Sequence, residues 1–204
     1  MTTIDIDTPH GQARAHVHSV DGPRGWLVLG HGAGGGVAAR DLVAATQAAT
    51  GDGIAVALVE QPYRVAGRRS PAPARRLDAA WLAVVERLRD DLVDERPLVV
   101  GGRSSGARVA CRTAGATGAA GVVCLAFPLQ PPRRKAGEPP PSRLVELDAV
   151  TVPVLVVQGV RDPFGMPPPG PARTVVQVDG DHSLRTDLAA VSEAVASFLR
   201  GLLA

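Results

Sequence analysis

The fold of this chain is decided by one stretch, Val99-Val100-Gly101-Gly102-Arg103-Ser104-Ser105-Gly106-Ala107-Arg108-Val109-Ala110. Its apolar start indicates a buried strand, its glycines indicate a sharp turn, and the residues that follow have the composition of a helix. At the apex of such a turn a serine is held out of the sheet with its hydroxyl exposed. The stretch therefore predicts a strand, a strained turn and a helix, with a serine at the turn.

The spacing of the glycines selects which serine occupies the apex. The turn brings the residues two before and two after the apex close together, so both must be small. Gly102 and Gly106 meet this requirement around Ser104, whereas an apex at Ser105 would place the bulky Arg103 there. We therefore predict Ser104 as a nucleophile and Ser105 as a donor through its backbone N–H. The structural alternative is a glycine-softened turn without chemistry, because short motifs also match by chance.

Composition favours a single globular domain over residues 1–204. The chain is 45% hydrophobic, which is enough for a sizeable core at this length. Its 22 Lys and Arg residues nearly balance 20 Asp and Glu residues, which leaves a net charge of +2. A nucleic-acid interface would need a concentrated basic face, and the few aromatic residues argue against a base-stacking platform. We expect no nucleic-acid partner.

Positive charge is carried almost wholly by arginine, with local runs at Arg68-Arg69, Arg75-Arg76 and Arg133-Arg134-Lys135. These runs could bind anions, but solvated loops and helix ends are the favoured interpretation. Cys111 and Cys124 are too few for a disulfide framework and lie in apolar contexts. They are expected to be small buried thiols.

The chain start and the hydropathy pattern bear on location. Residues 1–5 show no basic start followed by an apolar run, and no window approaches the roughly 18 apolar residues of a membrane span. We expect a cytoplasmic protein with no membrane partner.

Apolar runs alternate with amphipathic segments along the chain. Strands are expected at 13–20, 26–29, 54–59, 97–100, 121–127, 154–157 and 174–178. Helices are expected at 37–50, 75–94, from the turn at Ser104 to about Thr113, and from Leu188 to Leu199, with a loop over 60–74. Strands that are apolar throughout and separated by helices predict an α/β fold, a mostly parallel central sheet with helices on both faces.

Three polar residues follow strands in a distinctive order. Ser104, Asp162 and His182 each come just after a predicted strand, at the edge where an open α/β sheet places its reacting groups. Serine, then acid, then histidine is the chain order of α/β hydrolases. A neutral imidazole must accept the serine proton, and a carboxylate must fix the tautomer of that imidazole. We predict a Ser104, His182, Asp162 triad.

Two other acids compete for the histidine. Asp179 and Asp181 lie beside His182 in sequence, but a tight loop orients such near neighbours poorly. Asp162 is therefore ranked first, and Asp181 is interpreted as a turn residue.

Acyl transfer also needs backbone donors directed at the developing oxyanion. The N–H of Ser105 is one, and the glycine-rich loop from Gly30 to Gly36 should supply the other, with Ala33 first and Gly34 second. His31 in this loop is a candidate for the substrate-binding region, although a structural hydrogen-bonding role is the more usual one.

The same loop suggests a different function. Gly30, Gly32 and Gly35 between a strand and a helix, with Glu60 after the next strand, match a dinucleotide-binding fingerprint. That interpretation leaves Ser104, Asp162 and His182 unexplained, and an oxyanion loop is equally rich in glycine. A phosphate-binding P-loop is excluded, because no Lys followed by Ser or Thr comes after these glycines.

Several motifs together carry a resemblance to a known family. They are Leu29-Gly30-His31-Gly32-Ala33-Gly34-Gly35, Gly101-Gly102-Arg103-Ser104-Ser105-Gly106, Phe127-Pro128-Leu129, the segment from Gln158 to Gly165, and Gly180-Asp181-His182-Ser183-Leu184. Over residues 25 to 204 the chain resembles small α/β-hydrolase-fold proteins related to dienelactone hydrolases. More narrowly, it resembles the family that includes a testis-expressed protein and a subunit of the NSL histone acetyltransferase complex. The resemblance implies a serine-hydrolase site, although some members act as scaffolds, and Ser104 stands where dienelactone hydrolases have cysteine.

The site is expected to be open. Where larger hydrolases insert a helical lid, this chain has only a proline-rich segment over 128–142, so a small or exposed ester is the expected substrate. Arg103 and Arg161 flank the nucleophile and the acid and suggest an anionic substrate, although surface pairing is their alternative role. No metal or organic cofactor is implied. The competing function is an inactive hydrolase-fold scaffold whose partners bind the arginine-rich loops.

Overall fold

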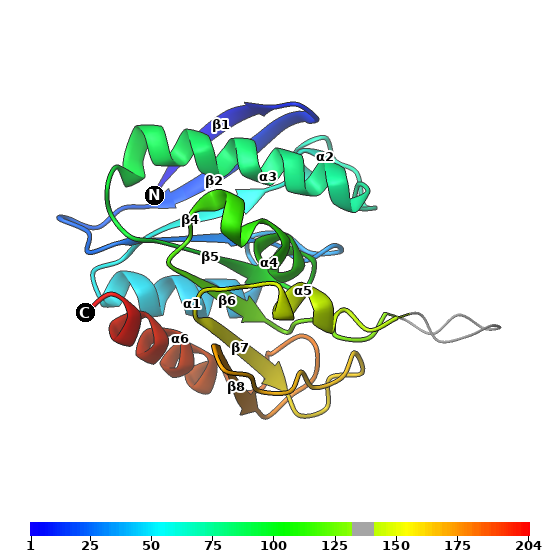
Figure 1. Cartoon of the computed structure of the whole chain (residues 1–204). Coiled ribbons are helices and arrows are strands. Elements are labelled where there is room, and N and C mark those ends of the chain that lie inside the picture. The colour runs from blue at the N-terminus through cyan, green and yellow to red at the C-terminus, as the bar shows by residue number, and fades with distance from the viewer. Residues whose placement is uncertain (132–140) are drawn as a thin grey trace.

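The computed structural model describes residues 1–131 and 141–204, in which eight strands form one sheet (Figure 1). The strand order is β1-β2-β4-β3-β5-β6-β7-β8. The strands are β1 (Thr2–Thr8), β2 (Gly11–His18), β3 (Trp26–Gly30), β4 (Ala55–Glu60), β5 (Leu98–Arg103), β6 (Gly121–Leu125), β7 (Val154–Gly159) and β8 (Arg173–Val178). β1 and β2 form an antiparallel hairpin that joins β4, and all pairs from β4 to β8 are parallel.

Helices cover both faces of the sheet. They are α1 (Arg40–Gly51), α2 (Pro62–Val65), α3 (Ala74–Leu88), α4 (Ser105–Thr117), α5 (Leu144–Asp148) and α6 (Leu188–Leu202). Figure 1 shows α1 and α6 on one side of the sheet and α3 and α4 on the other. Successive strand residues enter the two cores alternately, as Val99 does on the α1 and α6 side and Val100 on the α3 and α4 side. The predicted α/β class and mostly parallel sheet are confirmed.

The hairpin differs from the sequence expectation. A strand was expected at 13–20, whereas β2 spans Gly11–His18 and pairs with β1, which the sequence pattern did not indicate. β1 lies at the edge of the sheet, and Ile6 is its one buried residue. Ile4 and Ile6 do alternate with Asp5 and Asp7, but this strand signal covers only four residues.

Two predicted segments contain structure that was not expected. α2 interrupts the predicted loop over 60–74, and the long helix predicted to reach residue 94 is α-helical only to Leu88, with a π-helical turn over Arg89–Val93. Among the residues described between β6 and β7, the five-residue helix α5 is the only helix, and no lid is evident in them. Residues 132–140 of the proline-rich segment, including the run at Arg133, lie outside the described residues.

No helix in residues 1–131 or 141–204 is long and apolar enough to cross a membrane.

Two glycines, Gly102 of β5 and Gly106 of α4, lie against the backbone of Gly30 in β3. A Cβ atom on Gly106 would lie 2.3 Å from the carbonyl oxygen of Gly30, and one on Gly102 would lie 2.4 Å from the same oxygen. Gly102 also has φ of 156°, which side chains rarely adopt. Gly102 and Gly106 therefore cannot carry a side chain, because both lie in direct contact with the backbone of Gly30.

This contact makes Gly106 intolerant of a single added methyl group. We expect Gly106→Ala to lower the free energy of unfolding by about 3 kcal/mol or more, because backbone atoms must move to admit the Cβ. Gly115→Ala is the matched control on the same helix, since a Cβ there meets nothing within 4 Å. The control should be neutral or stabilise the fold by up to about 1 kcal/mol. Denaturant unfolding checks both variants, and equal effects would contradict the packing account.

Candidate active site

Ser104 occupies the turn between β5 and α4 in a strained conformation. Its φ of 52° and ψ of −106° are unusual for a residue with a side chain. Its backbone N–H donates to the Leu125 carbonyl of β6 at 2.9 Å, and its carbonyl accepts from Arg108 N–H in α4. The turn is thus tied to the neighbouring strand on one side and to the helix on the other, which keeps the Ser104 side chain at the sheet edge.

The structure brings the three predicted side chains into one hydrogen-bonded chain. Ser104 Oγ lies 2.9 Å from His182 Nε2, and His182 Nδ1 lies 2.8 Å from Asp162 Oδ2. The Asp162 side chain is only 1% exposed, whereas that of His182 is 19% exposed. A buried carboxylate on Nδ1 favours the tautomer that leaves Nε2 free to accept the serine proton.

The acid is held by contacts that the sequence analysis did not assign. Gln158 Nε2 donates to Asp162 Oδ2 at 2.8 Å, and Phe164 N–H donates to Asp162 Oδ1 at 2.8 Å. The Phe164 ring also packs edge-on against the His182 imidazole, with 4.5 Å between ring centroids. Gln158 and Phe164 both belong to the motif segment from Gln158 to Gly165, but only the fold shows which atoms they hold.

The competing acids have other partners. Asp181 Oδ1 accepts from the backbone N–H and the hydroxyl of Ser183, and these bonds lower the pKa of Asp181. Asp179 pairs with Arg161 at the surface. Asp162 is therefore the carboxylate that contacts His182 in this structure.

The loop after β3 is fixed by two side chains. His31 is 3% exposed, and its Nε2 accepts from Gln61 N–H at 3.2 Å while its Nδ1 contacts the Gly32 carbonyl at 2.8 Å. Because Nε2 is an acceptor here, Nδ1 carries the proton and donates to that carbonyl. Burial lowers the pKa of His31, which supports the neutral ring. Tyr63 Oη donates to the Ala33 carbonyl at 3.0 Å.

These bonds orient the predicted oxyanion donors. In a trans peptide the C=O and the following N–H point in opposite directions, so a fixed Gly32 carbonyl also fixes the direction of the Ala33 N–H. Among the described residues, the N–H groups of Ala33, Gly34 and Ser105 donate to no other residue. Ser105 is the first residue of α4, where N–H groups lack helical acceptors. The loop thus leaves donors unpaired near the turn, and His31 contacts protein atoms through both ring nitrogens.

Comparison with known proteins assigns the family. The family described as alpha/beta hydrolase domain matches residues 23–194. The chain belongs to this alpha/beta hydrolase family. No curated protein has a sequence that matches the chain significantly.

Solved structures agree with this assignment at the level of the fold. Est1E from Butyrivibrio proteoclasticus is similar with a TM-score of 0.79 at 17% identity, over 98% of each chain. XC6422 from Xanthomonas campestris, an α/β serine hydrolase without a lid, has a TM-score of 0.75 at 19% identity, over 98% of this chain and 94% of that one. A dienelactone hydrolase from Anabaena variabilis has a TM-score of 0.76 at 14% identity, over 100% of this chain and 98% of that one.

Arg103 is held in this hydrolase by a buried acid. Its Nε lies 2.8 Å from Asp41 Oδ2 of α1, and its Nη2 donates to the His182 carbonyl at 3.0 Å. Burial raises the pKa of Asp41, while the adjacent guanidinium acts in the opposite direction. Arg103 therefore links α1 to the loop that carries His182, a role that the sequence analysis missed because the partner lies far away in the chain.

Two other predicted site residues, Arg161 and Glu60, also have protein partners, and the two cysteines are buried as expected. Arg161 pairs with Asp179 at the surface, so both arginines expected at the substrate already meet a carboxylate. Glu60, the acid of the dinucleotide fingerprint, lies 2.9 Å from His16 Nε2. Cys111 and Cys124 are buried free thiols. Within the described ranges, no group of three or more His, Cys, Asp or Glu side chains could hold a metal ion.

The buried pair predicts a strong coupling between Asp41 and Arg103. Arg103→Met leaves an unpaired buried carboxylate and should destabilise the fold by about 3–5 kcal/mol, much of which Asp41→Asn should restore in the double variant. The exposed pair of Arg161 and Asp179 is the matched control, with an expected coupling below about 1 kcal/mol. Unfolding free energies of both double-mutant cycles measure this, and equal couplings would contradict the positioning role of Arg103.

Proposed function

We propose that this hydrolase is a serine esterase that acts through an acyl-enzyme on a small or exposed ester. The observation that carries the proposal is the chain of contacts from Ser104 Oγ through His182 to Asp162. Ser104 Oγ attacks the ester carbonyl carbon while His182 Nε2 takes its proton. Asp162 orients the imidazole and stabilises the imidazolium that forms.

The developing oxyanion accepts hydrogen bonds from the N–H groups of Ser105 and Ala33, with Gly34 as the second choice in the loop. Collapse of the tetrahedral intermediate breaks the ester C–O bond, and His182 gives its proton to the departing alkoxide. Water then attacks the acyl-enzyme as His182 takes a proton from it. Release of the carboxylic acid returns the proton to Ser104 Oγ.

An ester of modest size is supported by the surroundings of Ser104. In the part of the chain described between β6 and β7, the only helix is α5, which has five residues. XC6422 is a serine hydrolase without a lid, and Est1E has been solved with ferulic acid bound. We also propose, on the motifs quoted above, kinship with the small lid-less group related to dienelactone hydrolases and to the testis-expressed and NSL-complex proteins. Esters of small aromatic or aliphatic acids are therefore the first substrates to assay.

A fluorophosphonate probe tests the nucleophile directly. We expect the wild-type protein to be labelled and Ser104→Ala to lose labelling, because the probe reacts only with an activated hydroxyl. Ser105→Ala is the matched control and should keep most of the labelling, since only its backbone N–H is used. His182→Ala should slow labelling by about 100-fold or more.

Two results would overturn this assignment. Labelling that survives Ser104→Ala would place the nucleophile elsewhere. A folded wild-type protein that is never labelled would instead favour a hydrolase-fold scaffold.

A further inference from the structure

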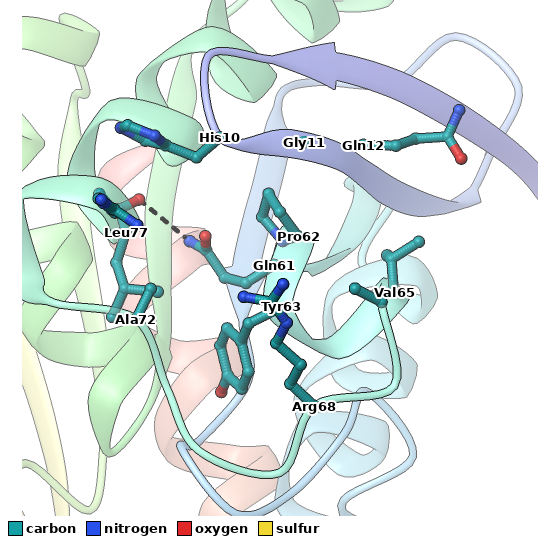
Figure 2. Close-up of a pocket in the computed structure, with 12 residues that line it drawn as sticks. His10, Gly11, Gln12, Gln61, Pro62, Tyr63, Val65, Arg68, Ala72 and Leu77 are labelled. Carbon is teal, nitrogen blue, oxygen red and sulfur yellow. Dashed lines mark hydrogen bonds between the residues drawn. The ribbon is translucent and has the colours of Figure 1, made fainter.

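A pocket separate from the triad lies next to α2, and none of the three triad residues lines it (Figure 2). The turn of the β1–β2 hairpin at His10 forms one wall, and the chain from Gln61 through α2 to Leu77 forms the other. Its volume of about 530 Å³ lies within the range of small-molecule sites. Neither the predicted triad nor the proposed ester chemistry uses this space.

The floor of the pocket holds an unpaired acceptor. Gln61, Tyr63 and Leu77 are each 6% exposed, and Gln61 Nε2 donates to the Leu77 carbonyl at 3.2 Å. That bond fixes which end of the amide is nitrogen, so Oε1 is an acceptor, and it has no donor among the described residues. Figure 2 shows this amide in the middle of the lining residues. A buried acceptor without a partner costs about 1–3 kcal/mol. Less than 1 Å² of Oε1 is exposed, so a ligand O–H or N–H recovers this cost only when the side chains around the amide shift to admit it.

The rim of the pocket is cationic. Arg68 and Arg76 line it, both are exposed, and neither pairs with a carboxylate among the described residues. No Asp or Glu lines the pocket. Other arginines of this chain do find acids, as Arg112 does with Asp78 at 2.6 Å. The rim therefore carries positive charge that the described fold leaves uncompensated.

The charge of the rim and the acceptor on the floor indicate the chemistry of a ligand that would fit this pocket. We propose that this pocket binds a small organic anion whose carboxylate meets Arg68 and Arg76. Its apolar body packs on Pro62 and Tyr63, and a hydroxyl or amide N–H at its far end donates to Gln61 Oε1. A guanidinium binds a carboxylate through charge-assisted hydrogen bonds, which are stronger than neutral ones.

Two residues that line the pocket are hydrogen-bonded to the oxyanion loop. Tyr63 lines the pocket with its ring and donates its hydroxyl to the Ala33 carbonyl, while Gln61 N–H donates to His31 Nε2. A ligand on this floor would therefore contact the two residues whose bonds orient the loop. A ligand can bind here without any reaction at Ser104. The binding proposal can therefore fail while the esterase proposal holds, and the reverse is also true.

4-Hydroxybenzoate is a suitable probe, because it has a carboxylate, an aromatic ring and a distal O–H. It is titrated by calorimetry and NMR into the full chain carrying Ser104→Ala, which removes the proposed nucleophile. We expect saturable binding to one site. Adding Arg68→Gln and Arg76→Gln should weaken binding by about fivefold or more, since both charge-assisted contacts are lost.

The matched control adds Arg69→Gln and Arg75→Gln, which remove the same charge from neighbours that do not line the pocket. This control should change the affinity by less than about twofold. 4-Hydroxybenzamide should bind with equal affinity to both double variants, and benzoate should bind more weakly than the probe because it lacks the donor for Gln61. The proposal is wrong if 4-hydroxybenzoate does not bind. It is also wrong if both double variants weaken binding equally, or if Arg68→Gln and Arg76→Gln leave the affinity unchanged.

Discussion

The candidate site depends on one backbone contact, the approach of Gly102 and Gly106 to the carbonyl of Gly30. No side chain fits between α4 and β3 at this level, so the chain must turn sharply and Ser104 must take a positive φ. The cost of that conformation is offset by the packing of α4 and β5 in the two cores. A strained turn supported by a rigid sheet holds the serine hydroxyl in one place before any substrate arrives.

Polar contacts orient the loops on the same edge relative to this turn, in addition to the apolar packing of Phe164 on His182 and of Leu184 in the core. Arg103 joins Asp41 of α1 to the His182 carbonyl, and Gln158 holds Asp162. His31 and Tyr63 do the same for the carbonyls of the oxyanion loop. The Arg103–Asp41 contact is an ion pair, whereas the others are hydrogen bonds, which are directional and fix the orientation of groups that must act on atoms about 3 Å away.

The sequence predicted those features whose physical causes are local. The sequence alone shows the glycines two residues before and two residues after Ser104. It also shows the polar residues at the strand ends, since neither pattern depends on tertiary contacts. Asp41 and Tyr63 were missed because their roles exist only after folding brings together residues far apart in the chain, such as Arg103 and Ala33. β1 was missed because its apolar/polar alternation is limited to two isoleucines, of which only Ile6 is buried.

If Ser104 is the nucleophile, it must carry the acyl group during turnover, and this intermediate can be trapped. Wild-type protein is mixed with 4-nitrophenyl acetate, quenched during the initial burst of 4-nitrophenolate, digested and analysed by mass spectrometry. We expect an acetyl group on the hydroxyl of Ser104, in an amount that matches the burst. An acetyl group on another residue, or hydrolysis with no covalent intermediate on Ser104, would contradict it.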